Sequence, residues 1–144
     1  MQHENPTTVI ALDIGAARTG VAMANSIARI ASPLEAIVPV DDVPERVREL
    51  VLEHGVVAVV AGLPRNLEGN ETGQTAFVRD VIAQIESVID VPVHTIDEAV
   101  TSARAEAELQ LRRKTFTKED IDMLSATYIL EDYLQTNPEV FSRV

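Results

Sequence analysis

The chain has 144 residues, 46% of them hydrophobic and 24% charged, a composition typical of one globular domain that excludes a disordered or fibrous protein. Its 23 acidic residues outnumber its 12 basic ones, and the resulting net charge of −11 repels phosphate backbones at long range. Because only 3% of the residues are aromatic and cysteine is absent, base stacking is not expected as the main binding mode, and disulfides and cysteine-ligated metal sites are excluded.

The beginning of the chain predicts a tail and three short strands. Residues 1–7 are expected to form a flexible tail without the features of a signal peptide. Thr8 to Ile14 (TVIALDI) is a nearly all-apolar run that ends at Gly15, as a buried strand does, and residues 19–24 and 28–38 follow as further strands. The connections between them are short, so these three strands are expected to be antiparallel.

Helices and strands alternate in the rest of the chain. The first helix has an apolar stripe, with Asp41 or Asp42 as its expected cap, Glu45 placed for a capping box and Gly55 as its end. The further elements expected are a strand over 56–61, a polar loop over 62–71, a helix over 72–89, a strand over 92–96, helices over 101–113 and 118–134, and a C-terminal tail over 136–144. This order predicts one α/β domain over 1–144, with a mixed sheet that begins antiparallel, continues with parallel strands and is covered by helices.

Three acidic positions lie where charge is not expected. Asp13 is inside the first strand, where an ionised carboxylate without a partner costs several kcal/mol, so it either lies at the open end of the strand or binds a cation. Asp97 and Glu98 directly follow the last strand, where the loops of α/β sheets assemble sites, although helix-capping or surface roles are the alternative. Successive residues of a strand point to opposite faces, so at most one of this pair shares the side of Asp13.

The third of these positions is Asp122, on the last predicted helix. It aligns with Ala126, Ile129 and Tyr133 on the inward apolar stripe, although an acid at the N-terminal end of a helix is also favoured by the helix dipole. Together with Asp13 and one of the 97/98 pair, it predicts three carboxylates that converge on a common point. Such hard oxygen ligands suit one or two Mg²⁺ or Mn²⁺ ions.

Several basic and polar residues are candidates for binding a phosphate. Arg65 and Asn66 lie in the glycine-containing polar loop, and Arg18 lies between Gly15 and Gly20. The densest basic segment consists of Arg112, Arg113, Lys114 and Lys118. The alternatives are an ordinary turn for the loop and a solvated helix end for the basic segment.

Four motifs follow one another between about Val9 and Leu134. They are Asp13-Ile-Gly15-Ala-Ala-Arg18-Thr-Gly20-Val21-Ala22, then Gly62-Leu63-Pro64 with Gly69, then Asp97-Glu98 with Thr101, and finally Asp122 followed by Ser125, Ala126, Ile129, Leu130 and Tyr133. Together they resemble the YqgF (RuvX-like) family. Asp-x-Gly strands also open sugar kinases and actin-like ATPases, so a nucleotide-binding phosphotransferase fragment is a rival interpretation. Such enzymes close two domains around ATP, whereas 144 residues hold only one.

The resemblance implies an RNase H-like fold of the RuvC-like branch, with a five-stranded mixed sheet and helices on both faces, and a metal-dependent nuclease. Its acidic triad corresponds to Asp13, Glu98 and Asp122 as catalytic and metal-binding residues, with Mg²⁺ or Mn²⁺ as the cofactor. The implied substrate is nucleic acid, either the 5′ end of pre-16S ribosomal RNA or a four-way DNA junction, and the RNA is preferred because the sequence shows no extended basic face. Without a signal peptide or a membrane-spanning stretch, the protein is expected to be cytoplasmic and not to bind membranes, as a monomer or homodimer. A non-catalytic module for ribosomal or transcription partners is the alternative of a different class. Family members usually carry Arg after the acid pair, whereas this chain has Ala99.

Overall fold

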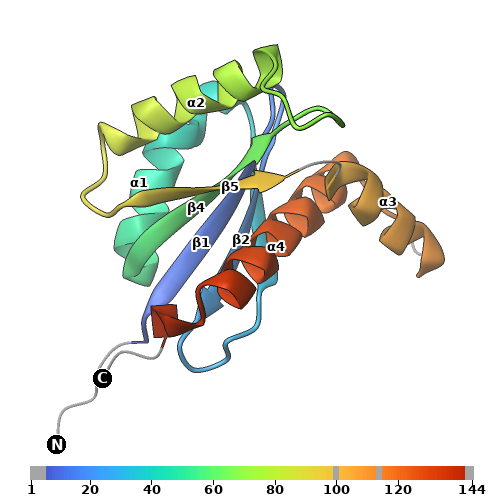
Figure 1. The fold of residues 1–144 in the computed structure, drawn as a ribbon. Coiled ribbons are helices and arrows are strands. Elements are labelled where there is room, and N and C mark those ends of the chain that lie inside the picture. Colours follow the sequence, from blue (N-terminus) through green and yellow to red (C-terminus); the bar gives the residue numbers. More distant parts are fainter. Residues whose placement is uncertain (1–5, 99–100, 113–114, 142–144) are drawn as a thin grey trace, which may run out of the picture.

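The structure is a computed structural model that describes residues 6–98, 101–112 and 115–141. Within these residues, five strands, four α-helices and two short 3-10 helices follow one another, and Figure 1 shows how they are arranged. In chain order they are β1 (Thr8–Ile14), β2 (Thr19–Asn25), β3 (Ser32–Ile37), η1 (Val40–Asp42), α1 (Val43–His54), β4 (Val56–Pro64), α2 (Gly73–Glu86), β5 (Val93–Glu98), α3 (Thr101–Leu111), α4 (Lys118–Thr136) and η2 (Pro138–Phe141).

The strands form one mixed sheet in the order β3-β2-β1-β4-β5. β1 and β2 pair antiparallel, as do β2 and β3, whereas β1 pairs parallel with β4 and β4 pairs parallel with β5. The expected mixed sheet with an antiparallel beginning is therefore confirmed. The carboxyl ends of β1, β4 and β5 meet at one edge of the sheet, beside the start of β2.

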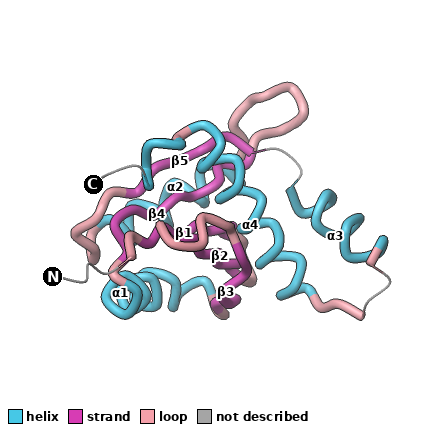
Figure 2. Tube along the Cα trace, turned by 90° about the horizontal axis from the view of Figure 1, so that it is seen from below, coloured by secondary structure: helices cyan, strands magenta, loops and turns pink. Residues whose placement is uncertain are grey.

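Helices cover both faces of this sheet, α1 and α2 on one side and α4 on the other (Figures 1 and 2). Side chains alternate along β1, so Ile10 and Leu12 enter the core under α1 and α2, whereas Val9 and Ala11 enter the core under α4. The α4 side is lined by small residues, which let the helix approach the strands closely. They include Ala11, Ala22, Ala24 and Ala58.

The helix α3 packs against α4 rather than on the sheet, and Figure 1 shows it projecting beyond the sheet. Ala105 and Leu109 form a small separate core with Leu124 and Tyr128 of α4. The Tyr128 hydroxyl donates a hydrogen bond of 2.7 Å to Glu108 of α3. No helix in the described parts of the chain combines the length and the apolar character that crossing a bilayer requires.

The structure corrects two expectations about local elements. Asp42 has helical backbone angles (φ −86°, ψ −6°) because η1 runs directly into α1, so its side chain makes no cap and the expected capping box with Glu45 is wrong. The third strand begins at Ser32 rather than at residue 28, because Asn25 Oδ1 accepts from the amides of Ile27 and Ala28 and closes a turn there.

The loop and the tail are also shorter than expected. β4 continues to Pro64, so the polar loop starts after it and not at Gly62. The expected tail over 136–144 contains the last residue of α4 and all of η2, where Phe141 is buried against the α4 side of the sheet. Arg29 Nη2 donates to the carbonyl oxygen of Phe141 at 3.1 Å, which ties η2 to the turn between β2 and β3.

Candidate active site at the carboxyl edge of the sheet

Asp13 is the next-to-last residue of β1 and follows Ala11 on the side of the sheet that α4 covers. Its partner on β2 is Gly20, and Gly62 of β4 comes one residue after the pair formed by Leu12 and Ala61. Glycine on both neighbouring strands therefore leaves Asp13 as the side chain that extends from this part of the sheet toward α4.

The two glycines also allow α4 to lie directly on the strands. A Cβ atom at Gly20 would lie 2.0 Å from the carbonyl oxygen of Asp122, and a Cβ atom at Gly62 would lie 2.6 Å from Cδ1 of Ile129. Gly20 cannot accept a side chain without moving the backbone of the helix, whereas a side chain at Gly62 would displace the end of the Ile129 side chain. The first turns of α4 are thereby placed against β2, which brings Asp122 next to Asp13.

The carboxyl group of Asp13 has an unusual electrostatic environment. It forms no hydrogen bond or ion pair with any residue that the structure describes. Burial, together with repulsion from Asp122, raises the pKa of Asp13 from 3.8 to about 7. A nearby cation would lower the pKa of this carboxyl group, because the cation stabilises its charged form.

Asp122 already has a cationic partner. Arg18 Nε donates a hydrogen bond of 2.7 Å to Asp122 Oδ2, and the two side chains are 27% and 16% exposed. Burial raises the pKa of Asp122, while the bond to Arg18 opposes that rise. Arg18 itself is held by a tight turn, in which the Gly15 amide donates to the Arg18 carbonyl oxygen at 3.0 Å.

Glu98 and Asp97 lie on opposite faces of β5. Glu98 follows Ile96 on the α4 side, and its Cγ is 3.5 Å from the place that a Cβ atom at Gly62 would take. Asp97 lies on the other side, where its Oδ1 is 3.0 Å from Nε of Arg65, and it is 63% exposed. Of the two neighbouring acids, Glu98 is therefore the one on the side of Asp13 and Asp122.

The three carboxylates share a face and an edge but do not form a closed cage. Within residues 6–98, 101–112 and 115–141, no three acidic or histidine side chains are grouped closely enough to hold a metal ion. The convergence of Asp13, Glu98 and Asp122 on one point, and their catalytic and metal-binding roles, stay predictions. Asp13 and Asp122 repel each other, and Asp122 is engaged by Arg18.

Among the expected phosphate-binding residues, Arg18 lies directly at these carboxylates. Arg65 is paired with Asp97, and its Nη2 lies 3.6 Å from Glu71. Asn66 Oδ1 accepts from the amides of residues 68 and 70, so it closes the loop as an ordinary turn residue.

In the basic segment, the charge of Arg112 is offset by an acid of α3. Arg112 pairs with Glu108 along α3, and Lys118 is exposed at the start of α4. Arg113 and Lys114 lie outside the described residues. The segment is therefore described only at its two ends.

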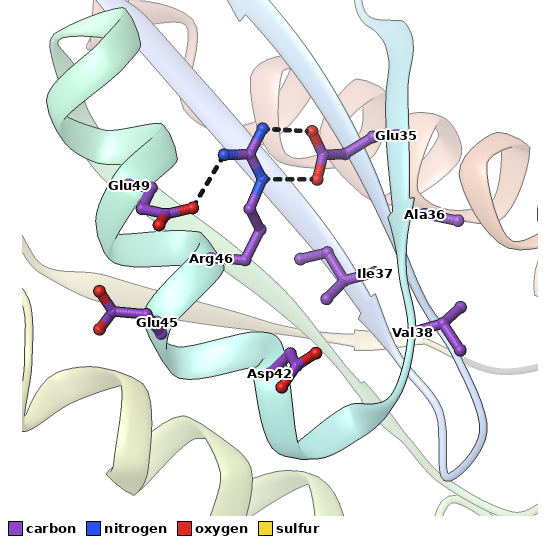
Figure 3. A pocket seen from close by; sticks show the side chains of 8 residues that line it. All are labelled: Glu35, Ala36, Ile37, Val38, Asp42, Glu45, Arg46 and Glu49. Atoms are coloured by element: carbon purple, nitrogen blue, oxygen red, sulfur yellow. Dashed lines mark hydrogen bonds and ion pairs between the residues drawn. The ribbon is translucent and has the colours of Figure 1, made fainter.

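A separate hollow lies between β3 and α1, away from the three carboxylates (Figure 3). Arg46 binds both carboxylate oxygens of Glu35 at 2.8 Å and donates to Glu49 at 3.0 Å. Asp42 and Glu45 also line this hollow, so its charge is acidic overall. A surface of this charge does not attract a phosphate backbone.

A family model and several relatives match this chain over most of its length. A family model with the description "RuvX: Holliday junction resolvase" matches residues 7–136. A protein of Chloroflexus aggregans named "Putative pre-16S rRNA nuclease" is 36% identical over 141 residues, which cover 95% of this chain and 99% of the relative. Proteins with the same name from a Sulfurihydrogenibium species and from Shewanella oneidensis are 35% and 34% identical, over 88% and 92% of this chain and 88% and 97% of their own.

Solved structures agree on the fold. RuvC of Thermus thermophilus in complex with a Holliday junction substrate aligns with a TM-score of 0.56 and 15% identity, over 90% of this chain and 95% of that chain. The Holliday junction resolvase of fowlpox virus aligns with a TM-score of 0.52 and 11% identity, over 90% and 99% of the two chains. These similarities confirm the expected RNase H-like fold of the RuvC type.

Proposed function

Since this chain belongs to the RuvX family of Holliday junction resolvases, we propose that it is a nuclease that hydrolyses phosphodiester bonds at the 5′ end of pre-16S ribosomal RNA. The relatives named as pre-16S rRNA nucleases support the substrate, because they match this chain over nearly its whole length. The observation that carries the chemistry is the placement of Asp13, Glu98 and Asp122 on one face and one edge of the sheet.

The donor set fits a divalent metal ion. All three groups offer hard oxygen atoms, and the carboxyl group of Asp13, without a partner among the described residues, is the one that a cation would stabilise most. Asp13, Glu98 and Asp122 would hold one or two Mg²⁺ or Mn²⁺ ions. A divalent ion bound there supplies Lewis acidity toward the phosphate and a lowered pKa of a bound water.

The residues of the chain itself position and neutralise the substrate. Asp13 serves in its ionised form, which is favoured as the pH rises through its pKa of about 7. Arg18 provides a guanidinium group beside Asp122, and such a group binds phosphate oxygens in a planar fork. All the proposed ligands come from one chain, so a monomer is sufficient, whereas a homodimer would present two sites to a four-way junction.

Four-way DNA junctions are the second candidate substrate, favoured by the description of the family. Precursor RNA is preferred here because most arginines in the described part of the chain are already paired with acids and form no extended basic face. These pairs involve Arg46, Arg48, Arg65, Arg79 and Arg112.

The test compares two neighbouring acids on opposite faces of β5. Purified protein is incubated in Mn²⁺ with the 5′ precursor segment of 16S rRNA and, separately, with a four-way DNA junction, with and without a chelator. We expect metal-dependent cleavage of the RNA that is lost in Glu98→Gln and kept in Asp97→Asn. Cleavage of the junction alone would replace the RNA by the second candidate, and binding without cleavage of either would favour a non-catalytic module.

A further inference from the structure

We propose that Arg18 is a tethered cation that neutralises Asp122 while no metal is bound and passes from Asp122 to a substrate phosphate when a divalent ion takes its place. The inference rests on the proposed nuclease site and concerns its regulation. Its geometrical basis is the 2.7 Å bond from Arg18 Nε to Asp122 Oδ2, which joins residues 104 positions apart in the sequence.

The backbone of Arg18 is fixed, although its side chain can move. The Gly15 amide donates to the Arg18 carbonyl oxygen, and a Cβ atom at Gly15 would lie 2.7 Å from that oxygen, so the turn requires glycine there. The guanidinium group stands at the end of a flexible side chain that is 27% exposed. It can therefore leave one oxygen for another nearby without any movement of the sheet.

The pair is not needed to hold α4 in place. The helix is anchored by Ala126, Ile129 and Leu130, which are buried against the sheet. Its backbone also contacts β2 directly at Gly20. Breaking the bond between Arg18 and Asp122 thus leaves the packing that positions α4 intact, which distinguishes this pair from a structural link.

Arg18 and a metal ion compete for the same carboxylate. Asp13 and Asp122 repel each other, and in the metal-free protein Arg18 supplies a positive charge that offsets part of this repulsion. A divalent ion supplies two charges, needs the same oxygens and repels the guanidinium at this distance. The released guanidinium then lies next to the ion, where a phosphate oxygen of the substrate would also bind.

Calorimetric titration with Mn²⁺ tests this competition in Arg18→Gln and in Arg48→Gln. Arg48 pairs with Glu45 on α1, so its variant removes the same charge on the far side of the sheet. We expect Arg18→Gln to bind Mn²⁺ about tenfold more tightly than the wild type and to melt about 2–4 °C lower without metal, while Arg48→Gln keeps the wild-type affinity. Unchanged or weaker Mn²⁺ binding by Arg18→Gln would overturn the inference, because a residue that only positions Asp122 lowers the affinity when it is lost.

A measurement on the wild type covers the case in which Arg18→Gln does not fold. The Nε–H resonance of Arg18 is followed by NMR during titration with Mg²⁺. We expect a shift and faster hydrogen exchange as the bond to Asp122 is released, and a resonance unchanged at saturating Mg²⁺ would refute the exchange. If the wild type cleaves RNA in the presence of metal while this resonance stays unchanged, the proposed function stands and only the role of Arg18 is wrong. If the wild type neither binds metal nor cleaves RNA, both the proposed function and the role of Arg18 are wrong.

Discussion

Asp13 is a carboxyl group placed where its charge is unfavourable for folding. It is inside a strand, beside Asp122, and no described residue pairs with it. Its neighbours Gly20 and Gly62 offer no side chain that could donate a hydrogen bond. This is the pattern expected of a residue retained for binding rather than for stability.

Replacing Asp13 by Asn should separate these two roles. At pH 8, without metal, we expect Asp13→Asn to be as stable as the wild type or more stable, because the change removes a repelling charge and keeps the volume. The same variant should lose RNA cleavage and most of the increase in melting temperature that Mn²⁺ gives the wild type. Melting curves of both proteins with and without Mn²⁺ measure this, and a variant destabilised without metal would show instead that Asp13 is a structural residue.

The close contact between Gly20 and the backbone of α4 leads to a second prediction. Gly20→Ala should destabilise the protein by about 1–3 kcal/mol, because the new methyl group overlaps the carbonyl oxygen of Asp122 and pushes α4 off the sheet. Gly73→Ala is the control, since no atom lies within 4 Å of the added methyl group at the start of α2. Urea denaturation measures both, and equal stabilities of the two variants would contradict the close approach of α4.

At the scale of elements, the edge strand β3 is joined to α1 by the bidentate pair of Glu35 and Arg46 (Figure 3). The hydrogen bond from Arg46 holds the pKa of Glu35 below its usual value of 4.5. A carboxylate with a lowered pKa in the folded state adds stability above its unfolded pKa. That stability is lost as the pH falls through the folded value.

The pH dependence of stability should therefore change in Glu35→Gln. At pH 7 we expect the variant to be less stable than the wild type by about 1 kcal/mol, and this difference should disappear between about pH 5 and pH 3. Urea denaturation across this range measures the difference, with Glu86→Gln as the control on an exposed acid of α2. A difference that is the same at pH 7 and pH 3 would show that Glu35 acts through packing and not through charge.

Strands and helices whose apolar residues recur at a regular spacing were predictable from the sequence, whereas the residues at which they begin and end were harder to predict. The alternation along β1 and β5 and the inward stripe of α4 depend only on local geometry, and they predicted which side Asp13, Asp122 and one of the 97/98 pair would face. The cap of α1 was not predictable, because η1 gives Asp42 a helical backbone. At α2 the cap is formed by Thr72 and Thr75, whose hydroxyl also donates to the carbonyl of Pro64.

The contacts that surround the candidate site were not predictable, because they join distant segments. The bond between Arg18 and Asp122 and the clearance at Gly20 and Gly62 depend on how α4 lies on the sheet. A local signal existed in the glycines, which occupy neighbouring strands at the level of Asp13. No local signal indicated that Arg65 would be engaged by Asp97.

At the scale of the whole molecule, the protein carries the same sign of charge as its proposed nucleic acid substrate. Its net charge is −11, and most of the described arginines are neutralised by acids of the same surface. The proposed binding of RNA would therefore depend on a few local contacts and on bound metal rather than on a broad electrostatic attraction.

This charge distribution predicts a weak dependence of RNA affinity on monovalent salt. With two or three phosphate contacts, we expect log K to fall with log[KCl] with a slope of about −2 for single-stranded RNA, at constant Mg²⁺. Fluorescence anisotropy with a labelled precursor segment measures the slope. A slope of about −5 or steeper would show a wide basic surface that the described residues do not provide.

The order in which the three carboxylates occur along the chain has a consequence for synthesis on the ribosome. Asp13 comes from β1, Glu98 from β5 and Asp122 from α4, so the three carboxylates share one edge of the sheet only after α4 has left the exit tunnel. Until then, the small residues of β1, β2 and β4 that α4 covers lack their partner. For the proposed nuclease, this order means that a nascent chain still lacking α4 has no assembled site and should not cleave RNA.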